Sequence, residues 1–200
     1  MPDEGGKVET AHADAGLAYE SSKLGIWIFL GTEVLLFGGL FLAYAVFRIK
    51  YPELFHRDHL ELNRTLGTVN TVVLICSSLS VAAGITAIRN GKADVLKKSL
   101  VVTLLLGATF LAIKYFEWSE DFAHGIYPGT DVFFSLYFMM AGVHGFHVLC
   151  GLLVMAWLLV QAGRGRFSAE YSTPVELTGI YWHFVDLVWI YLYPMFYLIG

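Results

Sequence analysis

Five long apolar stretches, separated by short polar segments, make up most of the 200-residue chain. Each is close to or above the ~20 residues that a helix needs to cross ~30 Å of hydrocarbon. Hydrocarbon leaves open backbone groups without partners, and a membrane β-barrel would show short alternating segments instead. We therefore predict five membrane-spanning helices, at Leu24–Phe47, Leu66–Ile88, Ser99–Phe116, Val132–Gln161 and Val175–Ile199.

The segments outside these stretches are polar. Pro52, Pro128 and Pro174 fall in the connections, whereas Pro194 lies near the end of the last stretch, where a kink is tolerated. Residues 1–23 are acidic and contain no apolar core, so we expect a tail and not a cleavable signal peptide. The expected organisation is an acidic tail over residues 1–23, followed by one all-α polytopic membrane domain over 24–200, a bundle of five transmembrane helices.

The composition agrees with this fold class. Hydrophobic residues make up 56% of the chain and charged residues only 15%, against about a quarter in soluble domains. The net charge of −4 comes mostly from the N-terminal tail, and no basic run with interleaved aromatic residues indicates nucleic acid. We therefore expect a membrane protein that does not bind nucleic acid.

The distribution of Lys and Arg predicts the orientation, because short cytoplasmic loops carry the excess of positive charge. The tail with the second and fourth connections holds eight basic residues, whereas the first connection holds four, and the third connection and the C-terminus hold none. We expect a cytoplasmic N-terminus and a periplasmic C-terminus, with Lys114 near a helix end snorkelling to the interface. The acidic segment, with Glu117, Glu120, Asp121 and Asp131, would then face the periplasm.

Glu33 lies about ten residues into the first stretch, which places its carboxyl group roughly 15 Å deep. An acid at this depth is costly and needs a reason. Either Glu33 handles protons or ions, or it is a neutral acid that is hydrogen-bonded between helices. Gly39 and Ala43 have the small-xxx-small spacing that lets helix backbones approach closely, so we expect neighbours to pack on this helix.

Histidines and acids of the last two stretches form a second candidate group. His144 and His147 are three residues apart and share a helical face at mid-depth, and His183 could face them from the fifth stretch. The histidines could ligate haem or copper, as in an independent membrane cytochrome, or they could hydrogen-bond neighbouring helices or lipid headgroups. Glu176 and His183, seven residues apart, lie on nearly one face, and Asp186 follows them.

The sequence does not assemble a self-contained catalytic centre. It has no Gly-rich phosphate loop, no nucleophile beside a base and no basic cluster for an anionic substrate. A transporter with Glu33 and Asp186 as proton carriers is an alternative, although neither repeats nor broken helices are visible. Small polar residues of the second stretch are expected to hydrogen-bond across helices, namely Asn70, Thr71, Ser77, Ser78 and Ser80.

Four motifs in these stretches resemble subunit III of the haem-copper oxidases. The resemblance extends from Leu24 to Gly200, and the aromatic run from Tyr115 to Trp118 also resembles the family pattern. In chain order the motifs are Trp27-Ile-Phe-Leu-Gly-Thr-Glu33-Val-Leu-Leu-Phe37, Asn70-Thr-Val-Val-Leu-Ile-Cys-Ser-Ser78, Gly142-Val-His144-Gly-Phe-His147-Val and Tyr181-Trp-His183-Phe-Val-Asp186-Leu-Val-Trp189.

The resemblance implies a subunit that binds no haem or copper itself and packs directly beside subunit I, with haem and copper in partner subunits. It implies structural phospholipids in a cleft between the first two helices and the others, with Glu33 near this cleft. The implied role is to stabilise the complex and to sustain proton uptake during turnover. Subunit II belongs to the same complex, and subunit IV and a respiratory supercomplex are further candidate partners.

The chain lacks the first two spans of the seven-helix members and so resembles the short bacterial form. That form is shared by cytochrome c oxidases, quinol oxidases and a nitric-oxide-reductase-associated relative. We expect a non-catalytic subunit III of a proton-pumping cytochrome c oxidase in the bacterial inner membrane, with the other two as alternatives. The candidate site residues are Glu33, and, for internal polar networks or lipid contacts, His144, His147, Glu176, His183, Asp186, Arg48 and Arg64, with no catalytic residue and no metal ligand among them.

Overall fold

The computed structural model describes the backbone of residues 4–199 and the side chains of residues 20–199. All regular elements in this range are helical, which confirms the predicted all-α class. The helices are α1 (Glu4–Lys50), α2 (Pro52–Asp58), α3 (Arg64–Arg89), α4 (Ala93–Ala123), α5 (Val132–Gly163), α6 (Thr173–Tyr193) and a π-helical turn, η1 (Pro194–Leu198).

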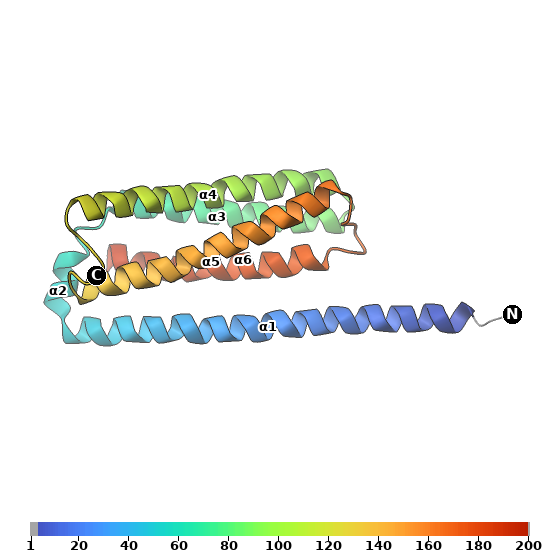
Figure 1. Ribbon diagram of the computed structural model, residues 1–200, viewed down its shortest axis with the longest axis horizontal. Helices are drawn as coiled ribbons and strands as arrows, with labels where there is room; N and C mark the ends of the chain where they lie inside the picture. The colour runs from blue at the N-terminus through green and yellow to red at the C-terminus, as the bar shows by residue number, and fades with distance from the viewer. Residues whose placement is uncertain (1–3, 200) are drawn as a thin grey trace.

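The helices α3 to α6 form a bundle, and α1 runs along one side of it and projects beyond one end (Figure 1). α1 packs mainly on α5, α6 and the short α2, and its Tyr44 also contacts η1. In its most apolar 18-residue window 11% of the residues are buried, against 33% to 39% for α3, α4 and α5. Neighbours pack on α1 as expected, and Ala43 contacts the core, but no atom outside the nearby turns of α1 lies within 4 Å of where a Cβ of Gly39 would stand, so the close approach does not include Gly39.

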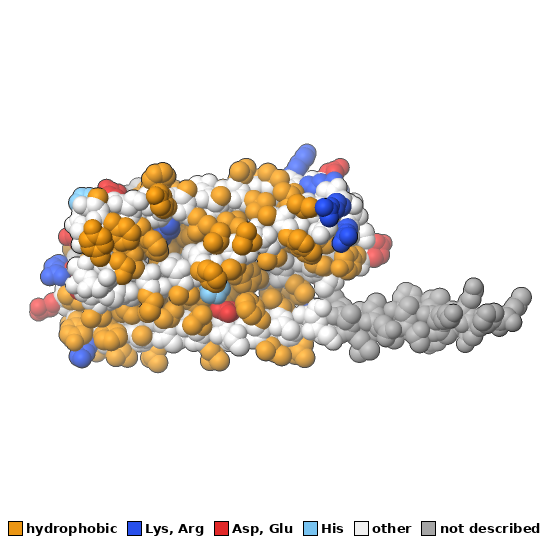
Figure 2. Space-filling model, in the orientation of Figure 1, with side chains coloured by type: hydrophobic (Ala, Val, Ile, Leu, Met, Phe, Trp, Pro, Cys, Tyr) orange, Lys and Arg blue, Asp and Glu red, His pale blue; other side chains and the backbone are white. Residues whose placement is uncertain are grey.

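Four helices of the described part are long and apolar enough to cross a membrane, namely α3, α4, α5 and the Glu20–Lys50 part of α1. Figure 2 shows hydrophobic side chains along the length of the bundle and charged side chains mostly at its two ends. α6, the fifth predicted span, carries Glu176 and Asp186 and is not among these four helices. It nevertheless packs inside the bundle against α3 and α5, so the molecule is a polytopic helical membrane protein with approximately five spans.

The helices α1, α3, α4 and α5 are longer than predicted because their polar end turns extend beyond the apolar segments, whereas α6 ends at Tyr193 and the π-helical turn η1 continues it. α4 runs from Ala93 to Ala123 instead of from Ser99 to Phe116, and α1 joins the predicted tail and the first span in one helix. Two side chains cap helices: Asn63 accepts from the backbone of Thr65 and Leu66 at the start of α3, and Asp131 accepts from Phe134 N at 2.9 Å at the start of α5.

The Asp131 cap of α5 is sensitive to pH. Burial raises the pKa of Asp131, the neighbouring Asp58 carboxyl raises it further, and the Phe134 N–H opposes them. A carboxyl group whose pKa is raised by folding stabilises the fold fully below its unfolded pKa of about 3.9, and this contribution is lost as the pH rises through the folded value. Asp58 Oδ1 accepts from Arg57 at 2.6 Å, so Arg57 is the cation that offsets this acidic pair.

We expect Asp131→Asn to flatten the pH dependence of thermal unfolding above about pH 4, because the amide still caps α5 but does not ionise. The measurement is the unfolding midpoint of the detergent-solubilised chain between acidic and neutral pH. Asp94→Asn, at an exposed ion pair with Lys97, is the control. If Asp131→Asn and the wild type gave the same pH profile, the cap would not be the sensitive group.

Polar side chains join α3 to α6, as predicted for the second stretch. Each pair joins a hydroxyl group of α3 to a nitrogen of α6, which satisfies both groups within the helix contact. Asn70 is the exception, because its fully buried amide has no hydrogen-bond partner among the described residues. The pairs are Thr71 with Trp189 at 3.0 Å, Ser77 with Trp182 at 2.9 Å and Ser78 with His183 at 2.6 Å.

Candidate functional site

Glu33 of α1 and His147 of α5 form a pair at the contact between these two helices. The Glu33 Oε2 atom lies 2.9 Å from His147 Nε2, and the two side chains are 13% and 12% exposed. The ring of Phe37, one turn after Glu33, meets the His147 ring edge-on at 5.3 Å. Tyr181 of α6 donates its hydroxyl to the backbone oxygen of His147 at 2.9 Å. The intramembrane acid is therefore hydrogen-bonded between helices, one of the two alternatives that the sequence left open.

The partners of His147 determine how many protons the pair holds. His147 Nδ1 lies 2.7 Å from the backbone oxygen of Val143, which can only accept, so Nδ1 carries a proton. His147 Nε2 then either accepts a proton from a neutral Glu33 or donates one to an ionised Glu33. In both cases one proton lies between the two side chains and the pair is neutral overall, which reduces the cost of burying it.

A cavity of about 470 Å³ opens beside this pair, between α1 and the α5–α6 pair. Its walls are mostly apolar or aromatic, and Glu33 and His147 are among the few polar groups that an apolar occupant would meet. Neither this cavity nor the next one is bordered by α3: the first lies between α1 and the α5–α6 pair, and the next between α1, α2 and η1. The lining residues are Ile26, Phe29, Glu33, Phe146, His147, Cys150, Val154, Leu177, Thr178 and Tyr181.

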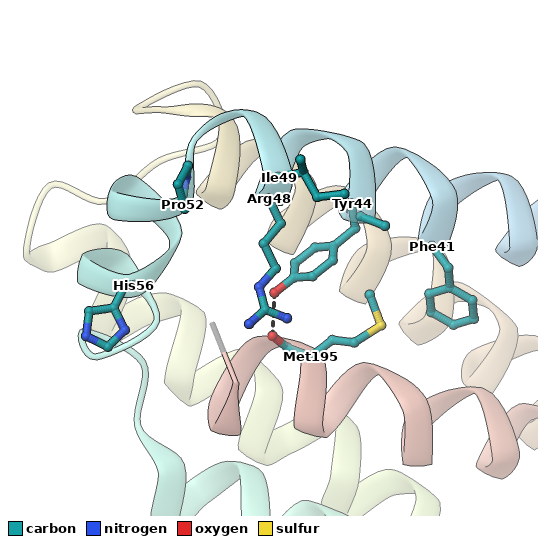
Figure 3. A pocket seen from close by; sticks show the side chains of 8 residues that line it. Phe41, Tyr44, Arg48, Ile49, Pro52, His56 and Met195 are labelled. Atoms are coloured by element: carbon teal, nitrogen blue, oxygen red, sulfur yellow. Dashed lines mark hydrogen bonds between the residues drawn. The ribbon is translucent and has the colours of Figure 1, made fainter.

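A second cavity, of about 650 Å³, lies at the other end of the α1 contact (Figure 3). Its lining combines apolar side chains with Arg48 and His56. Arg48 donates to the backbone oxygen of Ile199, and Tyr44 donates to that of Met195 at 2.5 Å, so α1 is attached to the chain end at this point. A cation beside an apolar hollow matches an acyl chain with an anionic headgroup.

The remaining candidate residues lie apart from this site. Arg64 donates to His59 at 3.2 Å near the start of α3, away from both cavities. Glu176 accepts two hydrogen bonds from Arg89, at 2.8 and 2.9 Å, and one from Ser172 at 2.7 Å. These bonds join the start of α6 to the end of α3, so Glu176 has a structural role.

The three histidines of the proposed haem site do not converge. His147 turns to α1, and His183 turns to Ser78 of α3. His144 is fully buried with neither ring nitrogen bonded among the described side chains, and its ring stacks on Trp189 at 5.2 Å. Among residues 20–199 there is no group of three or more His, Cys, Asp or Glu side chains that could hold a metal ion.

Lys114 and Glu117 of α4 form a buried ion pair that sequence reasoning missed. Lys114 does not snorkel: it is 7% exposed, and its Nζ donates to Glu117 Oε2 at 3.0 Å. Glu117 itself lies inside α4 and not in the connection after it. The hydroxyls of Tyr137 and Tyr197 bond both charged groups. Nζ also lies 4.9 Å from the centroid of the Trp189 ring. The signal was available, because residues 114 and 117 share one helical face.

Comparison with known proteins agrees with the motifs. The family model described as "Cytochrome c oxidase subunit III" matches residues 6–200. Cytochrome c oxidase subunit 3 of Thermostichus vulcanus is 34% identical over 177 residues, which cover 88% of this chain and 86% of that protein. Quinol oxidase subunit 3 of Bacillus spizizenii is 31% identical over 198 residues, covering 96% of each. A probable cytochrome c oxidase subunit 3 of Nocardia farcinica is 32% identical over 88% of this chain and 87% of that protein. The chain belongs to the cytochrome c oxidase subunit III family of the haem-copper oxidases.

Proposed function

We propose that this subunit III is a non-catalytic member of a bacterial proton-pumping oxidase complex in the inner membrane, with a cytoplasmic N-terminus and a periplasmic C-terminus. It packs beside subunit I, which with subunit II carries the haem and copper. It holds phospholipid against α1 and supports proton uptake during turnover. The Glu33–His147 pair at the apolar cavity is the observation that carries this proposal.

The loose packing of α1 supports the lipid role. One cavity separates α1 from α5 and α6, a second lies between α1, α2 and η1, and each combines an apolar lining with a few polar groups. Acyl chains would fill the apolar space, and Arg48 would contact a lipid headgroup. Glu33 and His147 would lie deeper in the membrane, beside the acyl chains. A lipid placed here would join α1 to the bundle and thereby stabilise the subunit.

The electron donor of the complex is proposed as cytochrome c, with quinol as the alternative. Both names occur among the relatives, and the Bacillus spizizenii quinol oxidase subunit covers slightly more of this chain. The donor binds outside this subunit on either reading. Purifying the complex and testing reduced cytochrome c against a quinol as the substrate for oxygen consumption would separate the two.

We expect Glu33→Ala to leave the haem spectrum of the purified complex unchanged and to accelerate its inactivation during turnover. A buried charge-assisted hydrogen bond contributes about 1.5–3 kcal/mol, so the rate of inactivation should rise about tenfold or more. The measurement is oxygen consumption over repeated turnovers, alongside a reduced-minus-oxidised spectrum and the phosphorus content of the complex.

Thr32→Ala is the matched control, because Thr32 is the exposed neighbour of Glu33 and its hydroxyl bonds only its own helix, at Phe29 O. It should behave as the wild type. Altered haem bands in Glu33→Ala would contradict the proposal, and so would an unchanged lifetime with unchanged phospholipid content.

A further inference from the structure

A third hollow, of about 640 Å³, opens at the end of the bundle that carries α2 (Figure 1) and shares no lining residue with the two cavities beside α1. It lies between the connection from α2 to α3, the last turns of α4 and the start of α5. Its lining contains four acids, Glu61, Glu117, Glu120 and Asp121, and neither Lys nor Arg. We call it the acidic hollow.

The acids of this hollow differ in depth and in pairing. Glu61 and Glu120 are exposed, whereas Asp121 and Glu117 are only 8% and 2% exposed. Glu117 has its counter-ion within the chain, in Lys114. No ion pair within residues 20–199 involves the carboxyl groups of Glu61, Glu120 or Asp121. The acidic hollow therefore holds three acids that this part of the chain does not neutralise.

Asp121 is the unpaired acid that is most removed from water. Its Oδ2 atom is enclosed without a hydrogen-bond partner among the described residues, whereas Oδ1 is not enclosed and is the oxygen open to the hollow. Asp186 of α6 differs, because both of its carboxyl oxygens are enclosed within this chain beside Ser78. A carboxylate that is largely buried without a counter-ion is costly, so a cation that enters the acidic hollow would bind favourably.

The lining indicates which kind of cation fits. Among residues 20–199 no group of three or more His, Cys, Asp or Glu side chains is placed to hold a metal ion. A lipid amine headgroup would bring its phosphate group with it, and the lining offers no Lys or Arg to receive the phosphate. A Lys or Arg side chain combines a charged end with an apolar stem. These two parts match the buried Asp121 and the apolar walls that Leu60 and Phe134 contribute.

We propose that the acidic hollow binds the side chain of a Lys or Arg residue of a neighbouring subunit in the oxidase complex. The charged end of that side chain reaches Asp121, and the exposed Glu61 and Glu120 steer it there. The inference rests on the proposed function, which places other subunits beside this chain. In the proposed orientation the hollow opens on the periplasmic side, so the basic residue belongs to a periplasmic segment of its subunit.

Substitution of Asp121 tests the acidic hollow in the intact complex. Asp121→Asn keeps the shape of the side chain and removes its charge, so the dissociation constant of this chain from the detergent-solubilised complex should rise about tenfold. Dissociation of the wild type should depend more steeply on NaCl concentration than that of Asp121→Asn, because salt screens an ion pair. The melting point of the chain alone should not fall. Glu53→Gln, at an exposed acid of α2 outside the hollow, is the control and should behave as the wild type.

Site-specific photo-crosslinking identifies the occupant. A benzophenone amino acid in place of Leu60, a lining residue that is 59% exposed, should join this chain to another protein subunit. The same probe at Leu153 of α5, which is 65% exposed and outside the hollow, should not give that product. Replacing the basic residue nearest the crosslink with Gln should weaken the binding of the wild type about tenfold and should not weaken that of Asp121→Asn further.

An unchanged dissociation constant for Asp121→Asn would overturn the acidic hollow as a binding site and leave the proposed function intact. Crosslinks from Leu60 to lipid alone, or fully additive losses in the double variant, would also overturn it. A wild-type chain that purifies from native membranes without any haem protein would overturn the proposed function as well.

Discussion

Replacing Lys114 with Met should destabilise the chain by about 3–5 kcal/mol, because the substitution leaves the Glu117 carboxylate buried without its counter-ion. Glu117 is 2% exposed, so water cannot take the place of the ammonium group. The hydroxyls of Tyr137 and Tyr197 would remain, but two neutral donors do not balance a charge in a medium of low dielectric constant.

The measurement is the free energy of unfolding of the chain in mixed micelles, from an SDS titration followed by tryptophan fluorescence. Lys97→Met is the matched control, because Lys97 pairs with Asp94 at the same three-residue separation in the same helix but at the surface. Its cost should be below about 1 kcal/mol. The double variant Lys114→Met/Glu117→Gln should recover much of the loss, since it removes both charges. Equal losses for Lys114→Met and Lys97→Met would contradict a buried pair.

The fold was largely predictable from the hydrophobic pattern, and the helix ends were not. Apolar stretches report the part of a helix that lies in hydrocarbon, whereas the helical hydrogen bonds of α4 continue through charged turns on both sides. The short α2 was missed for a related reason. It begins at Pro52, a favoured first helical position, but seven residues are too few to show a period.

The candidate site was predictable in its residues but not in its pairing. Depth along a helix follows from residue number, which identified Glu33 as an intramembrane acid. Glu33 and His147 are 114 positions apart in the chain, so their contact depends on the tertiary packing. Lys114 was misinterpreted because distance from a helix end was taken as the guide to exposure. Its side chain instead lies on the helical face that carries Phe110, Glu117 and Asp121, all buried.

Trp182 of α6 should be among the most sensitive positions of the core. Its side chain is completely buried, and its Nε1 donates to Ser77 of α3 at 2.9 Å. A Cβ added at Gly151 of α5 would lie 2.7 Å from the indole ring, and one at Gly107 of α4 would lie 3.1 Å from it. The ring thus fills the space between four helices, and Trp182→Ala should cost about 3–5 kcal/mol through the cavity that it leaves.

Two comparisons separate this packing effect from a general effect of losing a tryptophan. Trp157→Ala, at a side chain that is 52% exposed, should cost less than about 1 kcal/mol in the same SDS titration. Gly151→Ala should cost about 1–3 kcal/mol because the rigid ring cannot give way, whereas Gly145→Ala on the same helix, whose nearest contact would be at 4.0 Å, should be neutral. If Trp182→Ala and Trp157→Ala unfolded at the same SDS concentration, Trp182 would not be the side chain that holds α3, α4 and α5 around α6.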